Sequence, residues 1–320
     1  MPRLPHVAAA CLALGALASP SWTAPAWAVP FGQLVVFGDS NVDDGNYYAA
    51  SGGTAPVSPP YYQGRFSDGP VVVEYAAQRL GIPLVDYAYG GARTGADAPA
   101  DGFTVPSALT QIASYTASLN GAPIAPDALV VLWAGSNDLL GAERDTPAGR
   151  ADLSGRIAGA VGNVETAVTG LVQQGARTVL VANRTPRAVL TSDNNLNGID
   201  LNAAIAPAVQ GLAATLGADI RLFDAYGLIA DMQTDPAEYG FTNTTDPCLV
   251  GTVVCADPAA YTQWDAAHKT TRVHSLLADA LIAQAQGGRV QDVPEPASLA
   301  LVGAGLLVLA VRRRAPPVRA

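Results

Sequence analysis

The sequence contains little charge and little cysteine, and each shortage excludes a class of protein. Only 14% of the 320 residues are charged whereas 49% are hydrophobic, which excludes intrinsic disorder for most of the chain. Three cysteines are too few for a fold that depends on disulfides. The net charge is −9 and no block of Lys and Arg lies in the centre of the chain, so we expect no nucleic-acid partner.

Sequence motifs that bind cofactors or metals are also missing. The chain has no Gly-rich phosphate loop with Lys, no metal-binding spacing of Cys and His, and no dinucleotide fingerprint. Residues 193–198 imitate the start of an EF-hand calcium loop, but Ala204 occupies the twelfth position, where the loop needs a bidentate Glu. We therefore interpret residues 193–198 as a polar turn before a helix, and we expect neither a cofactor nor a metal.

Residues 1–28 have the three parts of a signal peptide. Arg3 gives a positive start, residues 8–18 are apolar, and residues 26–28 form a small-x-small cleavage site. We place the cut after Ala28; the alternative is a first helix buried in the fold. Export would leave Cys248 and Cys255 in a compartment where disulfides persist, so we expect a bond between them, the alternative being two small buried side chains.

The last 28 residues, 293–320, follow a different pattern. Val-Pro-Glu-Pro at 293–296 is followed by an apolar run at 297–311 and three arginines at 312–314. A helix of that run would rise about 22 Å, which is short for a hydrocarbon core of roughly 30 Å, while the arginines fit a positive-inside flank. This order resembles the PEP-CTERM sorting tail of bacterial exported proteins. The resemblance implies a short transmembrane segment, transient retention at the inner membrane and removal by an exosortase; the alternative is a short amphipathic tail.

Between these ends, residues 29–292 alternate short apolar runs with amphipathic stretches. We expect strands at 33–37, 84–88, 128–133, 178–182 and 220–223, and helices at 70–80, 107–119, 152–174, 201–216 and 270–286. This alternation predicts an α/β sandwich with a parallel sheet, in which ligands bind beyond the carboxyl ends of the strands. Polar or Gly-rich clusters follow several of these strands, so we expect the functional residues to meet at that edge.

Three of these clusters offer groups for ester or acyl chemistry. Ser40 follows the first strand at the start of a helix or loop, where an exposed hydroxyl suits a nucleophile; the alternative is a plain N-cap. Gly91 offers a backbone N–H and Asn137 a side-chain amide, and both can bind an oxyanion. The alternative for these two is ordinary turn chemistry.

The fourth cluster contains one of the two histidines that remain after residue 28. Asp265 precedes His268 by three residues, so its carboxylate can hold one ring nitrogen while the other faces a hydroxyl. His274 lies six residues further along a helix, well away from His268, and we interpret it as a structural residue. Four tyrosines after Ser40 either line a substrate cleft or pack within a solvated loop: Tyr47, Tyr48, Tyr61 and Tyr62. Between Ser40 and Tyr47, we interpret residues 43–46 as a turn.

The four clusters, in this order, resemble the blocks of the SGNH/GDSL hydrolase family. The matching residues are Gly38-Asp39-Ser40, Gly91, Gly135-x-Asn137-Asp138 and Asp265-x-x-His268, and residues 64–69 are similar to a segment of the lipase-like branch. The resemblance implies a three-layer α/β/α fold of flavodoxin-like kind with a five-stranded parallel sheet, and ester hydrolysis without a metal. Asn41 stands where Leu is usual and Lys269 where Pro is common, which we expect to alter loop shape rather than activity.

The resemblance also implies the role of each residue. Ser40 is the nucleophile, His268 the base and Asp265 the group that orients it, while the N–H groups of Ser40 and Gly91 and the amide of Asn137 form the oxyanion hole. We therefore expect an esterase, lipase or phospholipase in the periplasm, on the outer cell surface or outside the cell. Its substrate would be a small-molecule, lipid or acylated-glycan ester. The alternatives are an O-acetyl esterase of extracellular polysaccharide and a non-catalytic surface or matrix protein.

Overall fold

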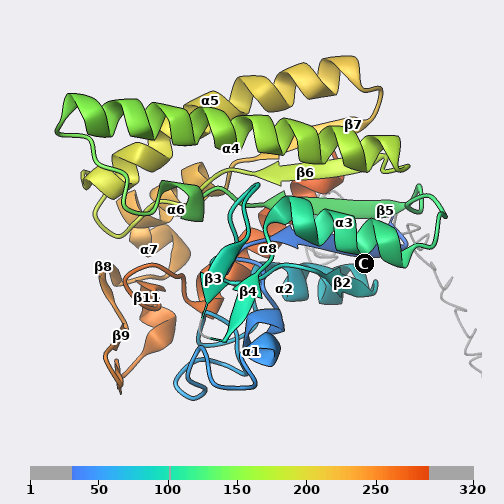
Figure 1. The fold of residues 1–320 in the computed structure, drawn as a ribbon. Coiled ribbons are helices and arrows are strands. Elements are labelled where there is room, and N and C mark those ends of the chain that lie inside the picture. The colour runs from blue at the N-terminus through green and yellow to red at the C-terminus, as the bar shows by residue number, and fades with distance from the viewer. Residues whose placement is uncertain (1–30, 101, 288–320) are drawn as a thin grey trace, which may run out of the picture.

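Five parallel strands form the central sheet of the computed structural model, which describes residues 31–100 and 102–287 (Figure 1). They are β1 (Gln33–Gly38), β2 (Leu84–Asp86), β5 (Ala128–Trp133), β6 (Thr178–Ala182) and β7 (Asp219–Phe223). Their order across the sheet is β2-β1-β5-β6-β7, which is the flavodoxin-like order in which the first two strands exchange places. The predicted strands at 128–133 and 178–182 have the same bounds in the structure.

Helices cover both faces of the sheet and make three layers, as predicted. One face carries α2 (Val72–Leu80), α6 (Ala225–Thr234) and α8 (Thr271–Ala285), and the other carries α3 (Ala108–Ser118), α4 (Pro147–Gln173) and α5 (Asp193–Thr215). Successive residues of β5 face opposite layers, since Val131 packs in the first and Val130 in the second. Both are fully buried, which explains why the strand is apolar throughout.

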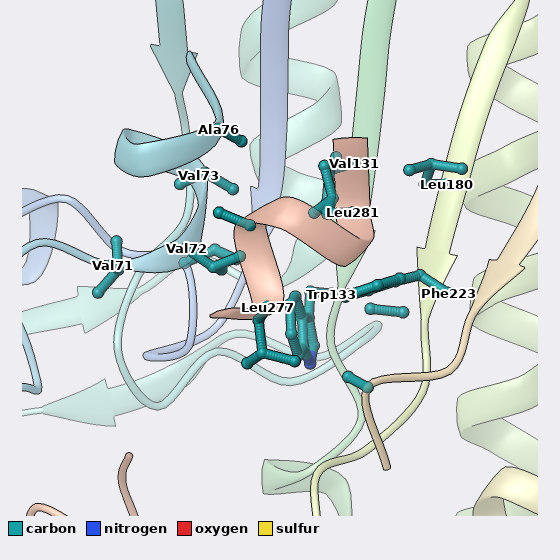
Figure 2. Close-up of a cluster of buried hydrophobic side chains, with 14 of the residues drawn as sticks. Val71, Val72, Val73, Ala76, Val131, Trp133, Leu180, Phe223, Leu277 and Leu281 are labelled. Carbon is teal, nitrogen blue, oxygen red and sulfur yellow. The ribbon is translucent and has the colours of Figure 1, made fainter. Parts of the chain in front are cut away.

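The core of the first layer shows how helix and sheet are held together (Figure 2). Leu277 and Leu281 of α8 pack with Val131, Trp133 and neighbouring side chains of the sheet. Each of these side chains is at most 1% exposed. Burial of a large apolar side chain stabilises a fold by about 1.5–3 kcal/mol, so the sheet is fixed on this face by many such contributions.

Two helices start earlier than predicted, and one interpretation was wrong. Helix α4 begins at Pro147, after the capping side chain of Thr146, and not at residue 152. Helix α5 begins at Asp193, so residues 193–198 form its first turns and are not a polar turn before it. The buried amides of Asn195 and Asn197 offset their low helix propensity by donating to the carbonyl oxygens of preceding segments.

Helix α6 was not predicted, and several smaller elements were also missed. They are α1 (Asn46–Ala50), β3 (Ala98–Ala100), β4 (Phe103–Val105), α7 (Pro236–Tyr239), β8 (Asn243–Pro247), β9 (Leu249–Val250), β10 (Val253–Val254), β11 (Tyr261–Gln263), and two 3₁₀ turns at Asn137–Leu139 and Pro258–Ala260. Strands β9 and β10 form a hairpin that the disulfide between Cys248 and Cys255 closes, with Cα atoms 4.8 Å apart. The predicted bond is therefore confirmed.

The two predicted ends of the chain, 1–28 and 293–320, lie outside the described residues, and so does the apolar run at 297–311. Within 31–100 and 102–287, no helix combines the length and the apolar character that crossing a membrane requires. The predicted transmembrane segment lies outside these residues and stays a prediction.

Candidate active site

A cleft of about 270 Å³ lies at the carboxyl edge of the sheet. Its walls come from the segments that follow β1, β2, β5 and β6, together with the loop before α8. The lining residues are Ser40, Asn41, Tyr47, Phe66, Gly90, Gly91, Ser136, Asn137, Leu140, Thr185, Arg187, Ala267 and His268. The cleft thus lies where a parallel α/β sheet binds its ligands, and it includes four of the five predicted site residues.

The structure brings Ser40, His268 and Asp265 into one chain of contacts. The Oγ of Ser40 lies 2.9 Å from Nε2 of His268, and Nδ1 of His268 lies 2.7 Å from Oδ2 of Asp265. These separations are hydrogen-bonding distances. Ser40 and His268 are 228 positions apart in the sequence, so their contact depends on the fold and not on a local turn.

The His268 loop is built to hold the imidazole in place. It leaves β11 and returns at Lys269, which forms a bridge with Gln263. Within the loop, Oδ1 of Asp265 accepts the N–H groups of Ala267 and His268, each at 2.7 Å. The carboxylate therefore fixes the backbone of the turn as well as the ring of His268.

Tyr61 adds a contact to Asp265 that the sequence did not predict. Its hydroxyl donates to Oδ2 of Asp265 at 2.7 Å, across 204 positions of sequence. Burial alone would raise the pKa of the Asp265 carboxyl, but the hydrogen bond and charge of His268, together with Tyr61, hold that pKa well below its usual range. Asp265 is therefore ionised whenever His268 carries a proton. The centroid of the Phe66 ring lies 5.0 Å from that of the imidazole ring.

Candidate oxyanion donors line the same cleft as the Ser40 hydroxyl. Gly91 has a φ of +79°, which a residue with a Cβ adopts only with strain. The N–H groups of Ser40 and Gly91 donate to no other group within the described part of the chain. Asn137 donates one amide hydrogen to the carbonyl oxygen of Ala92 at 2.9 Å, which leaves its second hydrogen for the cleft.

A buried acid, Asp43, and a half-buried acid, Asp138, fix the loop that carries Gly91. Asp43 accepts the N–H of Gly90 at 2.7 Å and also the N–H groups at the start of α1. Residues 43–46, predicted as a turn, form a bend that leads into α1, where Asp43 accepts the N–H groups of Gly45 and Asn46. The Asp43 carboxylate also joins this bend to the Gly90 loop, and burial raises the pKa of this carboxyl to about 6. On the other side, Asp138 accepts the N–H of Thr94 at 3.0 Å and its hydroxyl at 2.6 Å.

The two residues that depart from the family pattern, Asn41 and Lys269, both make hydrogen bonds that hold the fold together. Asn41 donates its amide to Oδ1 of Asp39 at 2.7 Å and is nearly buried. Lys269 is the only lysine in the sequence, and its side chain is 1% exposed. Its Nζ donates to the carbonyl oxygen of Pro186 at 2.6 Å and to Oε1 of Gln263 at 2.8 Å. Burial lowers the pKa of Lys269 far below its ordinary value.

His274 takes no part in the Ser40–His268–Asp265 chain. It lies in α8, is 2% exposed, and its Nδ1 has no hydrogen-bond partner among the described residues. Burial, followed by the charges of His268 and Lys269, lowers its pKa to about 3. Of the four tyrosines after Ser40, only Tyr47 lines the cleft.

The site joins a serine hydroxyl, an imidazole and a carboxylate in one chain of contacts, at the edge of a parallel sheet and beside free N–H groups. This arrangement defines the serine hydrolases as a class. The chain belongs to the GDSL-like lipase/acylhydrolase family, which matches residues 34–281. It is accordingly a hydrolase of ester bonds.

Three curated relatives are 24–29% identical to this chain over the aligned residues. A phosphatidylcholine-sterol acyltransferase of Aeromonas hydrophila is 29% identical, over 70% of this chain and 67% of its own length. A thermolabile hemolysin of Vibrio parahaemolyticus is 27% identical, over 78% of this chain and 63% of its own length. A GDSL esterase/lipase of Arabidopsis thaliana is 24% identical, over 79% of this chain and 89% of its own length.

The C-terminal pattern is also confirmed at the level of sequence. Residues 292–314 match the PEP-CTERM protein-sorting motif. This motif indicates export by the exosortase pathway.

Proposed function

We propose that the protein is an exported serine esterase that hydrolyses carboxylic esters of lipids, with Ser40 as nucleophile, His268 as base and Asp265 as the group that orients the base. The observation that carries this proposal is the continuous chain of contacts from Asp265 through His268 to Ser40, which ends in the cleft. The 2.9 Å between Ser40 and His268 allows proton transfer without rearrangement.

In the first half of the reaction, the Oγ of Ser40 attacks the ester carbonyl carbon while Nε2 of His268 takes the hydroxyl proton. The imidazolium gives this proton to the departing alcohol oxygen, and the acyl group stays on Ser40. In the second half, His268 removes a proton from water, the hydroxide attacks the acyl-enzyme, and the acid leaves as Ser40 regains its proton. Asp265 remains ionised throughout and stabilises the imidazolium, because its pKa is held low.

The negative charge that forms on the carbonyl oxygen needs donors already in place. The N–H groups of Ser40 and Gly91 and the second amide hydrogen of Asn137 meet this need, since each belongs to a residue that lines the cleft. Three donors that are already oriented stabilise the tetrahedral intermediate more strongly than water does.

A lipid ester is the substrate class that the cleft favours. Tyr47, Phe66 and Leu140 give part of its wall an apolar surface, against which an acyl chain can pack. Two relatives are named for a phosphatidylcholine acyltransferase and a hemolysin, which supports the same class. An O-acetyl esterase of polysaccharide would instead act on short acetyl esters of sugars.

Two assays test this proposal on the exported protein. A fluorophosphonate probe should label the wild type and not Ser40→Ala. The wild type should also cleave p-nitrophenyl esters of increasing chain length, and Ser40→Ala should cleave each of them more slowly by several powers of ten. Ser114→Ala, at an exposed position of α3, is the matched control and should behave as wild type. A folded Ser40→Ala that retains its rate would refute the mechanism, and activity confined to acetylated sugars would favour the polysaccharide esterase.

We also propose that the sorting tail holds the protein at the inner membrane until an exosortase removes it, and that the enzyme then acts in the periplasm, on the outer surface or outside the cell. The sorting motif at 292–314 and the disulfide both support an exported protein. Cells with and without a functional exosortase can be fractionated to test this. The uncut chain should accumulate in the membrane fraction only in the cells that lack the exosortase.

A further inference from the structure

The segment after β6 contains two arginines that form no ion pair with a described carboxylate. Arg184 is 3% exposed and donates from Nη1 to the carbonyl oxygen of Asn194 at 2.7 Å. Arg187 follows on the same segment and lines the cleft. Within 31–100 and 102–287, neither guanidinium lies within 4.0 Å of a carboxylate oxygen. Removing a cation from water without an ion-pair partner is costly, so these two side chains favour an anionic ligand in this part of the site.

Arg187 is held rigidly and presents one edge of its guanidinium without a protein partner. Its Nε donates to Oδ1 of Asn194 at 2.9 Å, and its Nη1 donates to the carbonyl oxygen of Ala267 at 3.0 Å. Its Nη2 has no acceptor among the described residues. Two bonds thus fix the guanidinium plane beside His268, and a third nitrogen remains for a ligand.

The nearest acids do not fill this position. Asp39 and Asp265 lie close enough for their charges to act on Arg187, but neither forms an ion pair with it. Asp265 is already bound by His268 and Tyr61, and Asp39 accepts its hydrogen bonds from Asn41. Thr185 lines the same cleft as Arg187, and its hydroxyl donates to no described residue, so this wall offers a hydroxyl as well as the free guanidinium edge.

We propose that Arg187 and Thr185 form an anion subsite that binds the phosphodiester of a glycerophospholipid while Ser40 attacks one of its acyl esters. A phosphodiester carries a single negative charge and two free oxygens, which match a guanidinium edge with an adjacent hydroxyl. The inference rests on the proposed esterase function and adds a specificity to it. The enzyme then prefers esters whose alcohol carries a phosphodiester over the same esters without one.

A matched pair of soluble substrates isolates this preference. Dihexanoylphosphatidylcholine and dihexanoylglycerol have the same acyl esters, and only the first carries the phosphodiester. We expect the wild type to have the higher kcat/KM on the phospholipid. Arg187→Gln should lower the ratio of the two kcat/KM values about 10- to 100-fold, the range of one charge-assisted hydrogen bond. Arg187→Lys, which keeps the charge and loses the planar geometry, should lower the ratio less.

Arg177→Gln is the control for net charge. Arg177 is exposed and lies just before β6, at the opposite edge of the sheet from the cleft, so this variant should keep the wild-type ratio. Equal losses on both substrates in the Arg187 variants would overturn the subsite and make Arg187 a support for the His268 loop. Equal wild-type rates on the two substrates would overturn the subsite alone. Failure of the wild type on every ester would instead refute the proposed function.

Discussion

Acid should destabilise this protein through His274, and replacement of that residue by leucine should remove the effect. In the folded protein the pKa of His274 is about 3, because burial disfavours the charged ring. In the unfolded chain a histidine has a pKa near 6.5. At pH values between these two pKa values, His274 is therefore protonated in the unfolded state and neutral in the folded state. The free energy of unfolding must fall as the pH decreases through this window.

The size of the effect follows from the two pKa values. Each pH unit below 6.5 removes about 1.4 kcal/mol of unfolding free energy, so the loss reaches about 2 kcal/mol at pH 5. The buried carboxyl of Asp43 acts in the opposite direction over part of this range, because its pKa is raised to about 6 and the folded state takes up its proton first. The total pH dependence is thus a sum of opposing contributions, and only a difference between variants isolates His274.

The assay is urea unfolding of wild type and His274→Leu at several pH values between 5 and 7.5. Leucine keeps the site apolar and removes a buried Nδ1 that has no partner among the described residues. The variant should become relatively more stable as the pH falls, by about 2 kcal/mol between pH 7.5 and 5, and it should still hydrolyse esters. A difference in stability that does not change with pH would refute the reasoning, and loss of activity in the folded variant would mean that His274 acts in catalysis.

Three further results are expected. Asn137→Ala should lower kcat about 10²- to 10³-fold in single-substrate kinetics, because one oxyanion donor is lost while two backbone donors remain. Tyr61→Phe should lower kcat about tenfold or less, since Asp265 keeps its bonds to His268 and Ala267; a loss as large as that of Ser40→Ala would contradict this. A chain that ends at residue 292 should unfold at the same temperature and hydrolyse esters at the same rate as the full chain, and aggregation of the shorter chain would show that the tail belongs to the fold.

The sheet could be predicted because its strands are buried on both faces, and burial of this kind leaves a continuous apolar run in the sequence. The contact between Ser40 and His268, which follows β11 outside the central sheet, was implied only by the family resemblance, but the convergence of Ser40, Gly91 and Asn137 could be inferred for a related reason. The carboxyl ends of parallel strands share one edge, so motifs that follow different strands converge there. The contact between Asp265 and His268 could be inferred from their spacing of three residues.

Contacts between distant segments could not be predicted in the same way. The hydroxyl of Tyr61 reaches Asp265 across 204 positions, and Asp43 reaches Gly90 across 47. No periodicity records such pairs, because each depends on how two irregular loops fold over the same edge. The start of α5 was missed for a comparable reason: Asn195 is a weak helix former, and its helical state depends on bonds to Leu190 and Tyr226.

The burial of Lys269 has a practical consequence for chemical labelling. No other side chain of this sequence carries a primary amine, and the fold covers the Nζ of Lys269 and engages it with Pro186 and Gln263. Acylating reagents that attack side-chain amines therefore find no target on the described fold, and they gain one when it opens. Acylation mapped to Lys269 would therefore count the molecules that have unfolded, and coupling to a surface through this lysine would capture only those.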